Sequence, residues 1–344
     1  MRTLFDTTRI GSITLKNRFI RSATWESMAD QTGRPTRQLV DLYEELALGG
    51  VGMIITGATT IVPDPTGLPG MLSIADDRHI PAYQEMISKI HRHGVPVVMQ
   101  ITYVGRGGTW TTPVDLSEIE LRDLAGTYAD AAERAQKAGF DGIQIHAGHG
   151  YFLSQFQNSG KNKRTDRYGG EVTNRARFIL EMYDLVRSRV GNDFGVFIKI
   201  NCGDFEDEDD RVFETCRYTC NQLSERKIDG IEITGGAGNG LPLPPRGKYE
   251  ESVLRDYAAM IAEEIETPVM MVGMNRDLIL MSELLEKTKI SYFSMSRPFI
   301  REPDLVMRWK NHQEHKSACT SCNACRKQEI IRCPFRSVPE KMDS

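Results

Sequence analysis

Short apolar runs rich in β-branched residues recur along this chain, and longer stretches with helical periodicity separate them. Eight such runs lie at residues 18–23, 51–56, 97–102, 142–146, 196–201, 230–234, 269–272 and 292–296. The amphipathic stretches predict helices over residues 36–48, 80–93, 121–137, 174–190, 212–226, 250–264 and 277–286. Because strands that alternate with helices run parallel, the pattern predicts an α/β fold.

Eight strand–helix units match a (β/α)8 TIM barrel, for which roughly 250 residues is typical and insertions are common. The prediction divides the 344 residues into a barrel over residues 1–312 and a short cysteine-rich C-terminal tail over residues 313–344. A doubly wound open sheet is the alternative. No predicted strand is followed by the G-x-G-x-x-G turn of a dinucleotide-binding sheet, and this favours the barrel.

Candidate chemistry gathers directly after the fourth apolar run. The segment HAGHGY places His146, His149 and Tyr151 at the end of a predicted strand, where barrel enzymes keep their catalytic residues. A lone histidine at a strand end is more often structural, but three polar rings within six positions favour a functional site. Imidazoles can bind a substrate oxygen, and a phenol, still protonated at neutral pH, can donate a proton. These residue types suit the reduction of an activated double bond.

Composition narrows the range of partners and locations. The net charge of −4 gives no broad basic surface, so nucleic acid is not an expected partner. Residues 1–6 lack the order of a secretory signal, and no window approaches the roughly 18 apolar residues of a membrane span. We therefore expect a cytoplasmic protein that does not bind membranes.

Four of the seven cysteines crowd the tail. In a cytoplasmic chain they are expected to be thiols or metal ligands, and an odd total argues against a pure disulfide framework. The spacing C-x2-C-x2-C-x7-C predicts one metal site, formed by Cys319, Cys322, Cys325 and Cys333. The run followed by a distant Cys-Pro is typical of iron–sulfur ligation, and a zinc site with four cysteines tolerates the same spacing. A metal-free tail that covers the barrel is the third interpretation.

Several motifs in order give the chain a family resemblance. They are the opening LFDTTRIGSITLKNRF, GMIITGAT at the second run, VVMQITYVGR at the third, HAGHGY, RTDRYGG, and SMSRPFI at the eighth run. With these motifs, residues 1–312 resemble the Old Yellow Enzyme family of FMN-dependent ene-reductases. For RTDRYGG we predict a structural role, bracing the long loop after the fourth strand.

The resemblance implies a role for each matching residue. His146 and His149 would bind the carbonyl or nitro oxygen of the substrate, and Tyr151 would donate the proton. Gln100 would pair with the pyrimidine edge of the flavin, Lys199 would lie near flavin N1 and O2, and the ends of the last two strands would hold the phosphate. The implied cofactor-binding set is Ala23, Thr24, Trp25, Ala58, Gln100, Lys199, Gly273, Met274, Ser296 and Arg297. Trp25 departs from the family, whose members tend to place a smaller residue there, and either stacks on the ring or walls off the pocket.

The implied activity is ping-pong hydride transfer from NADH or NADPH, through FMN, to an electron-poor alkene. The tail resembles that of trimethylamine dehydrogenase and 2,4-dienoyl-CoA reductase, family members with an iron–sulfur cluster. This leaves two alternative functions open: a flavin and iron–sulfur amine dehydrogenase or demethylase, and a non-catalytic flavin or metal redox sensor. The alkene, the choice between NADH and NADPH, and assembly into a homo-oligomer also stay open.

Overall fold

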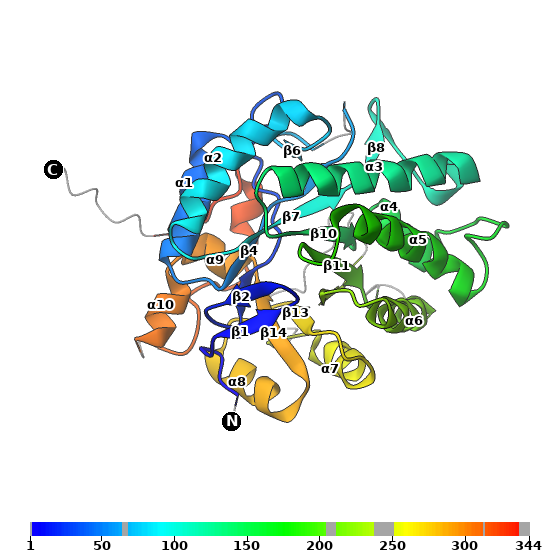
Figure 1. The fold of residues 1–344 in the computed structure, drawn as a ribbon. Helices are drawn as coiled ribbons and strands as arrows, with labels where there is room; N and C mark the ends of the chain where they lie inside the picture. The colour runs from blue at the N-terminus through cyan, green and yellow to red at the C-terminus, as the bar shows by residue number, and fades with distance from the viewer. Residues whose placement is uncertain (1, 64–67, 204–210, 237–250, 312–313, 337–344) are drawn as a thin grey trace.

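A closed barrel of eight parallel strands forms the centre of the molecule (Figure 1). The computed structural model describes residues 2–63, 68–203, 211–236, 251–311 and 314–336. Neighbouring strands pair in parallel all the way round, and β10 also pairs with β7, which closes the barrel. The barrel strands are β3 (Phe19–Arg21), β4 (Met53–Ile55), β7 (Val97–Thr102), β10 (Gly142–Ala147), β11 (Gly195–Asn201), β12 (Gly230–Thr234), β13 (Val269–Val272) and β14 (Ile290–Met295). The predicted TIM barrel is confirmed.

Helices surround the barrel and bury their apolar faces against it. The helices that follow the barrel strands are α1 (Arg37–Leu48), α2 (Ile80–His91), α3 (Glu118–Lys137), α5 (Val172–Val190), α6 (Arg211–Glu225), α7 (Arg255–Glu264) and α8 (Leu278–Lys287). Polar caps fix where several of them begin; Ser117 and Glu120, for example, form a reciprocal capping box at the start of α3. All seven predicted helices are present, although the first residue of the stretch 250–264 lies outside the described residues. No described helix has the length and apolar character that crossing a membrane requires.

A small antiparallel hairpin closes the bottom of the barrel, at the amino ends of the strands. It consists of β1 (Thr8–Ile10) and β2 (Ile13–Leu15), and its isoleucines are buried in a cluster with Phe197 and Met270. Packing there is close, since a Cβ added at Gly230 would lie 2.8 Å from Ile10 Cδ1. The hairpin was not predicted from the sequence. It turns the lower barrel interior into a closed apolar layer.

Loops and short elements cover the opposite end, at the carboxyl ends of the strands. They include β5 (Thr59–Thr60), β6 (Leu72–Ser73), the hairpin β8 (Gly105–Arg106) and β9 (Thr109–Trp110), α4 (Phe152–Gln157) and α9 (Arg297–Arg301). The last helix, α10 (Leu305–Lys310), lies instead near the amino end of β3, where the Trp309 ring packs on Phe19. The described part of the tail lies against this end, where the Ile331 amide donates to the Glu26 carbonyl at 3.0 Å. The predicted boundary at residues 312 and 313 lies outside the described residues.

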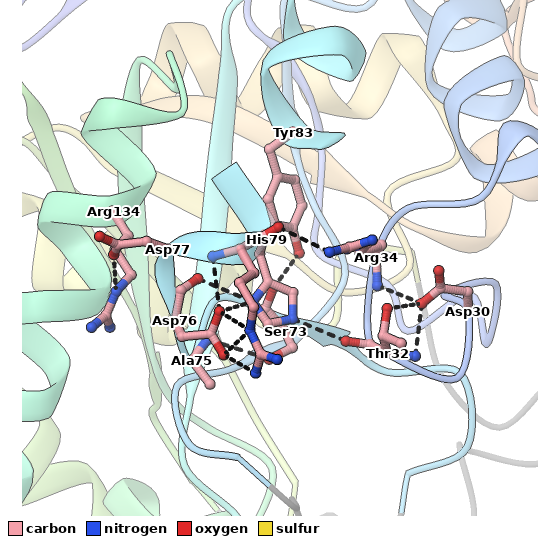
Figure 2. Close-up of polar contacts among 11 residues, drawn as sticks. Asp30, Thr32, Arg34, Ser73, Ala75, Asp76, Asp77, His79, Tyr83 and Arg134 are labelled. Carbon is pink, nitrogen blue, oxygen red and sulfur yellow. Dashed lines mark hydrogen bonds and ion pairs between the residues drawn. The ribbon is translucent and has the colours of Figure 1, made fainter. Parts of the chain in front are cut away.

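A polar network ties the long loop after β3 to β6 and the start of α2 (Figure 2). His79 is buried, and its two ring nitrogens lie 2.9 Å from the Thr32 carbonyl and 3.1 Å from the Asp76 carbonyl. Tyr83 donates to the Ser73 carbonyl at 2.9 Å, and Asp30 accepts from the Thr32 amide at 2.8 Å. These contacts fix the loop that begins beside the barrel mouth.

Candidate active site

A cavity of about 490 Å³ opens at the carboxyl ends of the strands. This volume falls in the usual range for small-molecule sites, roughly 300–1,000 Å³. Most of the predicted site residues line it: Ala23, Thr24, Trp25, His149, Tyr151, Lys199, Gly273, Met274, Ser296 and Arg297. Three of the predicted catalytic and flavin-binding residues do not reach its wall, namely Ala58, Gln100 and His146. The Trp25 indole N–H donates to the Pro69 carbonyl at 3.1 Å, which favours a pocket wall over a free stacking group.

The polar rings at the end of β10 and in the loop that follows it lie close together. The ring centroids of His146 and His149 lie 5.2 Å apart, and those of His146 and Tyr151 also lie 5.2 Å apart. The buried Nδ1 of His146 has no hydrogen-bond partner among the described residues. A buried polar atom without a partner is costly, and a bound oxygen would satisfy it. The arrangement is suited to hold a ligand at this point.

Backbone geometry sets the position of His149. Its φ is +60°, and its amide donates to Asn201 Oδ1 at 3.0 Å. Its Nε2 lies 3.0 Å from Thr234 Oγ1. A side chain at Gly148 would bring a Cβ within 2.9 Å of Thr234 Cγ2, so the sequence HAGHG needs glycine there. Contacts with β11 and β12 thus hold this imidazole.

The environment keeps both imidazoles neutral and the phenol protonated. Burial lowers the pKa of His146 well below its ordinary value, and the neighbouring His149 and Lys199 act in the same direction. Burial, followed by the charges of Lys199 and Arg326, lowers the pKa of His149 to about 3. Burial raises the pKa of Tyr151, although Arg326 opposes the shift. At neutral pH the site therefore offers imidazole hydrogen bonds and a phenolic proton.

A buried polar network lies next to these rings, inside the barrel. Lys199, on the cavity wall, donates to Ser22 Oγ at 2.8 Å and lies 3.3 Å from Glu232 Oε2. Gln144 Nε2 donates to Glu232 Oε2, and Gln100 Nε2 donates to Gln144 Oε1, both at 2.8 Å. Gln100 is therefore linked to the site through neighbours that the sequence did not single out.

The opposite end of the cavity suits a phosphate. Gly273 and Met274 have φ values of +132° and +56°, so the backbone turns sharply after β13. Thr24 Oγ1 lies 2.7 Å from Ser296 Oγ, and Arg297 donates to Asn323 Oδ1 at 2.9 Å. Burial lowers the pKa of Arg297, because desolvation disfavours the charged form. Cations at Lys199 and Arg297 fit an elongated ligand with a polar ring and a phosphate, as FMN is.

The tail cysteines border a second, much smaller cavity. This cavity, of about 20 Å³, is lined by Cys319, Cys322, Cys325 and Cys333, and Cys325 also lines the large cavity. No disulfide joins any of the seven cysteines, all of which lie in the described residues. Within those residues, no three His, Cys, Asp or Glu side chains group closely enough to hold a metal ion. The side-chain positions therefore do not support the predicted metal site.

The motif RTDRYGG makes the bracing contacts predicted for it. Arg164 pairs with Asp166 and donates to the carbonyls of Pro113 and Leu116. Tyr168 donates to Glu181 on α5 at 2.8 Å. These bonds fix the loop after β10 against α5 and against the loop that precedes α3.

The chain matches a known protein family over most of its length. The model of the NADH:flavin oxidoreductase / NADH oxidase family matches residues 3–112 and 108–316. The chain belongs to this family. A metal reductase from Desulforamulus reducens is 30% identical over 94% of the chain and 51% of its own length. An NADPH dehydrogenase from Halalkalibacterium halodurans is 28% identical over 87% of the chain and 91% of its own length.

Solved structures give the same fold. An old yellow enzyme homologue from Zymomonas mobilis has a TM-score of 0.82 at 24% identity, covering 98% of this chain and all of its own. The predicted resemblance to the Old Yellow Enzyme family is confirmed. The chain spans about half the length of the first curated relatives that it matches, among them an NADH oxidase from Thermoanaerobacter brockii, of which it covers 52%.

Proposed function

We propose that this member of the NADH:flavin oxidoreductase / NADH oxidase family binds FMN and reduces electron-poor alkenes with NADH or NADPH. The observation that carries the proposal is the ring cluster beside the cavity. His149 and the protonated Tyr151 line the cavity, and His146, with its unpartnered Nδ1, lies next to both rings. FMN, when bound, supplies hydride transfer from the nicotinamide to the β-carbon of the alkene. Substrates would be α,β-unsaturated carbonyl or nitro compounds.

Each residue of the cluster has a distinct task. His146 and His149 donate hydrogen bonds to the activating oxygen and stabilise the negative charge that develops there. Tyr151 gives its phenolic proton to the α-carbon, and its raised pKa keeps that proton in place until then.

Other residues hold the cofactor. Lys199 places a positive charge beside the ring, and Ser296, Arg297 and the turn at Gly273 and Met274 bind the phosphate. Ala23 and Thr24 line the same wall, and Trp25 closes one side of it. The proposed cofactor-binding residues also include Ala58 and Gln100, although neither lines the cavity. Gln100 is connected to the buried network through its hydrogen bond to Gln144.

An anaerobic titration of the purified protein tests the proposal. The visible flavin bands should bleach on addition of NADH or NADPH and return when a cyclic enone is added. A colourless protein that takes up no FMN would contradict the proposed cofactor. A flavin that is reduced but ignores enones and nitroalkenes would contradict the substrate class and favour a dehydrogenase.

The tail adds a second, separable part of the proposal: one metal centre at Cys319, Cys322, Cys325 and Cys333. The donor set is suitable for iron–sulfur or zinc, and the four residues share one cavity. Their side chains as placed are not grouped for a metal ion, so the reaction proposed above uses no step at the tail. Iron with acid-labile sulfide would indicate a cluster, and zinc alone a structural site. Protein produced with both metals available and containing neither would contradict the metal centre.

A further inference from the structure

The buried Glu232 is the one carboxylate of the network below the cavity. It is fully buried, with a relative exposure of 0%. Oε1 accepts from Ser22 Oγ at 2.8 Å, Oε2 accepts from Gln144 Nε2 at 2.8 Å, and Lys199 Nζ lies 3.3 Å from Oε2. These contacts give both carboxylate oxygens a hydrogen-bond donor, as buried polar atoms require. The proposed chemistry gives it no task.

The register of the barrel creates this network. Gln144 and Gln100 are direct partners in the pairing of β10 with β7, and Lys199 and Glu232 are direct partners in the pairing of β11 with β12. All four side chains are buried. The barrel therefore joins an ion pair to a pair of amides.

The carboxylate fixes which amide group donates and which accepts at each hydrogen bond of the network. A carboxylate only accepts, so Gln144 must turn its NH2 group toward Glu232. Its carbonyl then accepts from Gln100 Nε2, at 2.8 Å. Gln100 Oε1 is left without a partner among the described residues. The pyrimidine edge of a flavin has an N–H between two carbonyls and needs such an acceptor beside a donor.

Glu232 also offsets the charge of Lys199. The lysine lies on the cavity wall, and the carboxylate lies on the buried side of it. An anion in the cavity is therefore stabilised by a nearly neutral pair rather than by a full positive charge.

We propose that Glu232 is a positioning residue for the flavin: through Gln144 it orients the Gln100 amide toward the pyrimidine ring, and it limits how strongly Lys199 stabilises the anionic reduced cofactor. This inference rests on the proposed function, because it requires FMN in the cavity. It concerns cofactor affinity and reduction potential, and the substrate class does not enter it.

The central test measures FMN affinity and two-electron midpoint potential for the wild type, Glu232→Gln and Gln144→Met. Glu232→Gln leaves Lys199 uncompensated, and we expect reduced FMN to gain about tenfold over oxidised FMN, equal to about 30 mV upward. Gln144→Met keeps the ion pair but breaks the amide relay. We expect it to weaken oxidised FMN about two- to tenfold, as for one lost hydrogen bond, without changing the potential.

Glu26→Gln is the matched control, because Glu26 is another buried carboxylate in an ion pair, with Arg21 at 3.0 Å, and lies off the cavity wall. It should change neither quantity. If Glu232→Gln does not fold, the pair Lys199→Met and Lys199→Met/Glu232→Gln replaces it. The single variant should lower the potential, and the double variant should return it toward the wild type.

An unchanged potential in Glu232→Gln, or a double variant identical to Lys199→Met, would overturn the charge effect. Unchanged FMN affinity in Gln144→Met would overturn the relay. A wild type that binds FMN but ignores alkenes would defeat the proposed function and leave these measurements valid.

Discussion

The barrel interior is apolar at the amino ends of the strands and polar at their carboxyl ends. On a single strand, only two positions separate the two layers. On β7, β11 and the segment around β3, an apolar side chain of the lower cluster precedes a polar side chain of the upper network: Val98 before Gln100, Phe197 before Lys199, and Ile20 before Ser22. Side chains two apart on a strand point to the same side, so one strand supplies both layers. The lower layer is closed by the β1–β2 hairpin, while the upper layer borders the cavity.

The lower layer therefore contributes mainly to stability, and the upper layer contributes mainly to the chemistry of the site. The lower layer is apolar and closely packed, so its loss costs folding free energy. The upper layer holds an ion pair, amides and an unpartnered imidazole nitrogen, which a protein built only for stability would not retain. Substitutions at the two ends should therefore affect different measurements.

The largest effect is expected from Tyr151→Phe, at the upper end. Loss of the phenolic proton should slow alkene reduction about 10²- to 10⁴-fold and leave flavin reduction unchanged. Stopped-flow measurement of the two half-reactions separates these rates. Tyr292→Phe is the control at the lower end, where the hydroxyl donates to the Arg9 carbonyl at 2.9 Å and lies 3.2 Å from Thr8 Oγ1. Equal oxidative rates in Tyr151→Phe and wild type would rule out the proton-donor role.

Ile10→Ala, at the lower end, should reduce stability and leave FMN binding intact. Truncating this fully buried side chain leaves a cavity in the lower layer, and we expect a loss of about 2–5 kcal/mol in the free energy of unfolding. FMN affinity of the folded fraction should stay within about twofold of wild type. Urea denaturation and fluorescence titration measure the two quantities. A large loss of FMN affinity without a loss of stability would contradict the separation of the two ends.

The pH dependence should differ in sign between the ends. His149 has a folded pKa of about 3 against an ordinary value of 6.5, so its neutral form is favoured in the folded state. Stability is then full above pH 6.5 and falls as the pH drops toward 3, by about 1 kcal/mol between pH 6.5 and 5 for this partly exposed ring. His149→Asn should flatten this loss in urea titrations at several pH values.

His91, at the lower end, has the opposite behaviour. Its pKa is raised, because its ring lies 2.8 Å from Asp141 Oδ2. Its contribution is present below pH 6.5 and is lost as the pH rises through the raised pKa. In His91→Asn, the fall in the free energy of unfolding as the pH rises through the His91 pKa should therefore disappear. The dependence at acid pH should stay as in the wild type. Acid profiles that are identical in wild type and His149→Asn would contradict the lowered pKa of this imidazole.

The smallest effect is expected from Trp110→Ala, above the cavity. Trp110 is 51% exposed, and its ring stacks on Tyr151 with centroids 5.9 Å apart. An aromatic pair contributes about 0.5–1.5 kcal/mol, so the rate of alkene reduction should fall about two- to tenfold. Ile119→Ala, at an exposed position on α3, controls for loss of surface apolar area. Unchanged rates would mean that the stack does not orient Tyr151.

Sequence reasoning predicted the barrel well because its strands are buried on both faces. Such strands appear as unbroken apolar runs, and all eight became barrel strands. The β1–β2 hairpin was missed although Gly11 and Ser12 between Ile10 and Ile13 are a turn pattern. Strands of three residues carry little periodicity, and only the closed barrel shows what they cover.

Site residues were predicted where they end or follow a predicted strand or match a family motif, and were missed where only strand register shows their contacts. His146, Tyr151 and Lys199 were found from strand ends and family motifs. Gln144 and Glu232 were not, although each is a polar residue inside an apolar run. Their partners depend on strand register and barrel closure, which join β7 to β10 and β11 to β12. A search for polar residues within predicted barrel strands would have found both.

The hairpin at the bottom of the barrel also has a consequence for folding time. It connects residues far apart in the chain. The Tyr292 hydroxyl donates a hydrogen bond to the Arg9 carbonyl of the hairpin, and these two residues are separated by 283 positions. Contacts of such long range form late, after most of the loop-closure entropy has been lost. The apolar floor of the barrel is therefore completed only when its last strand is in place. Until then the interior surface stays open to water, and it is during this interval that the chain is most exposed to aggregation.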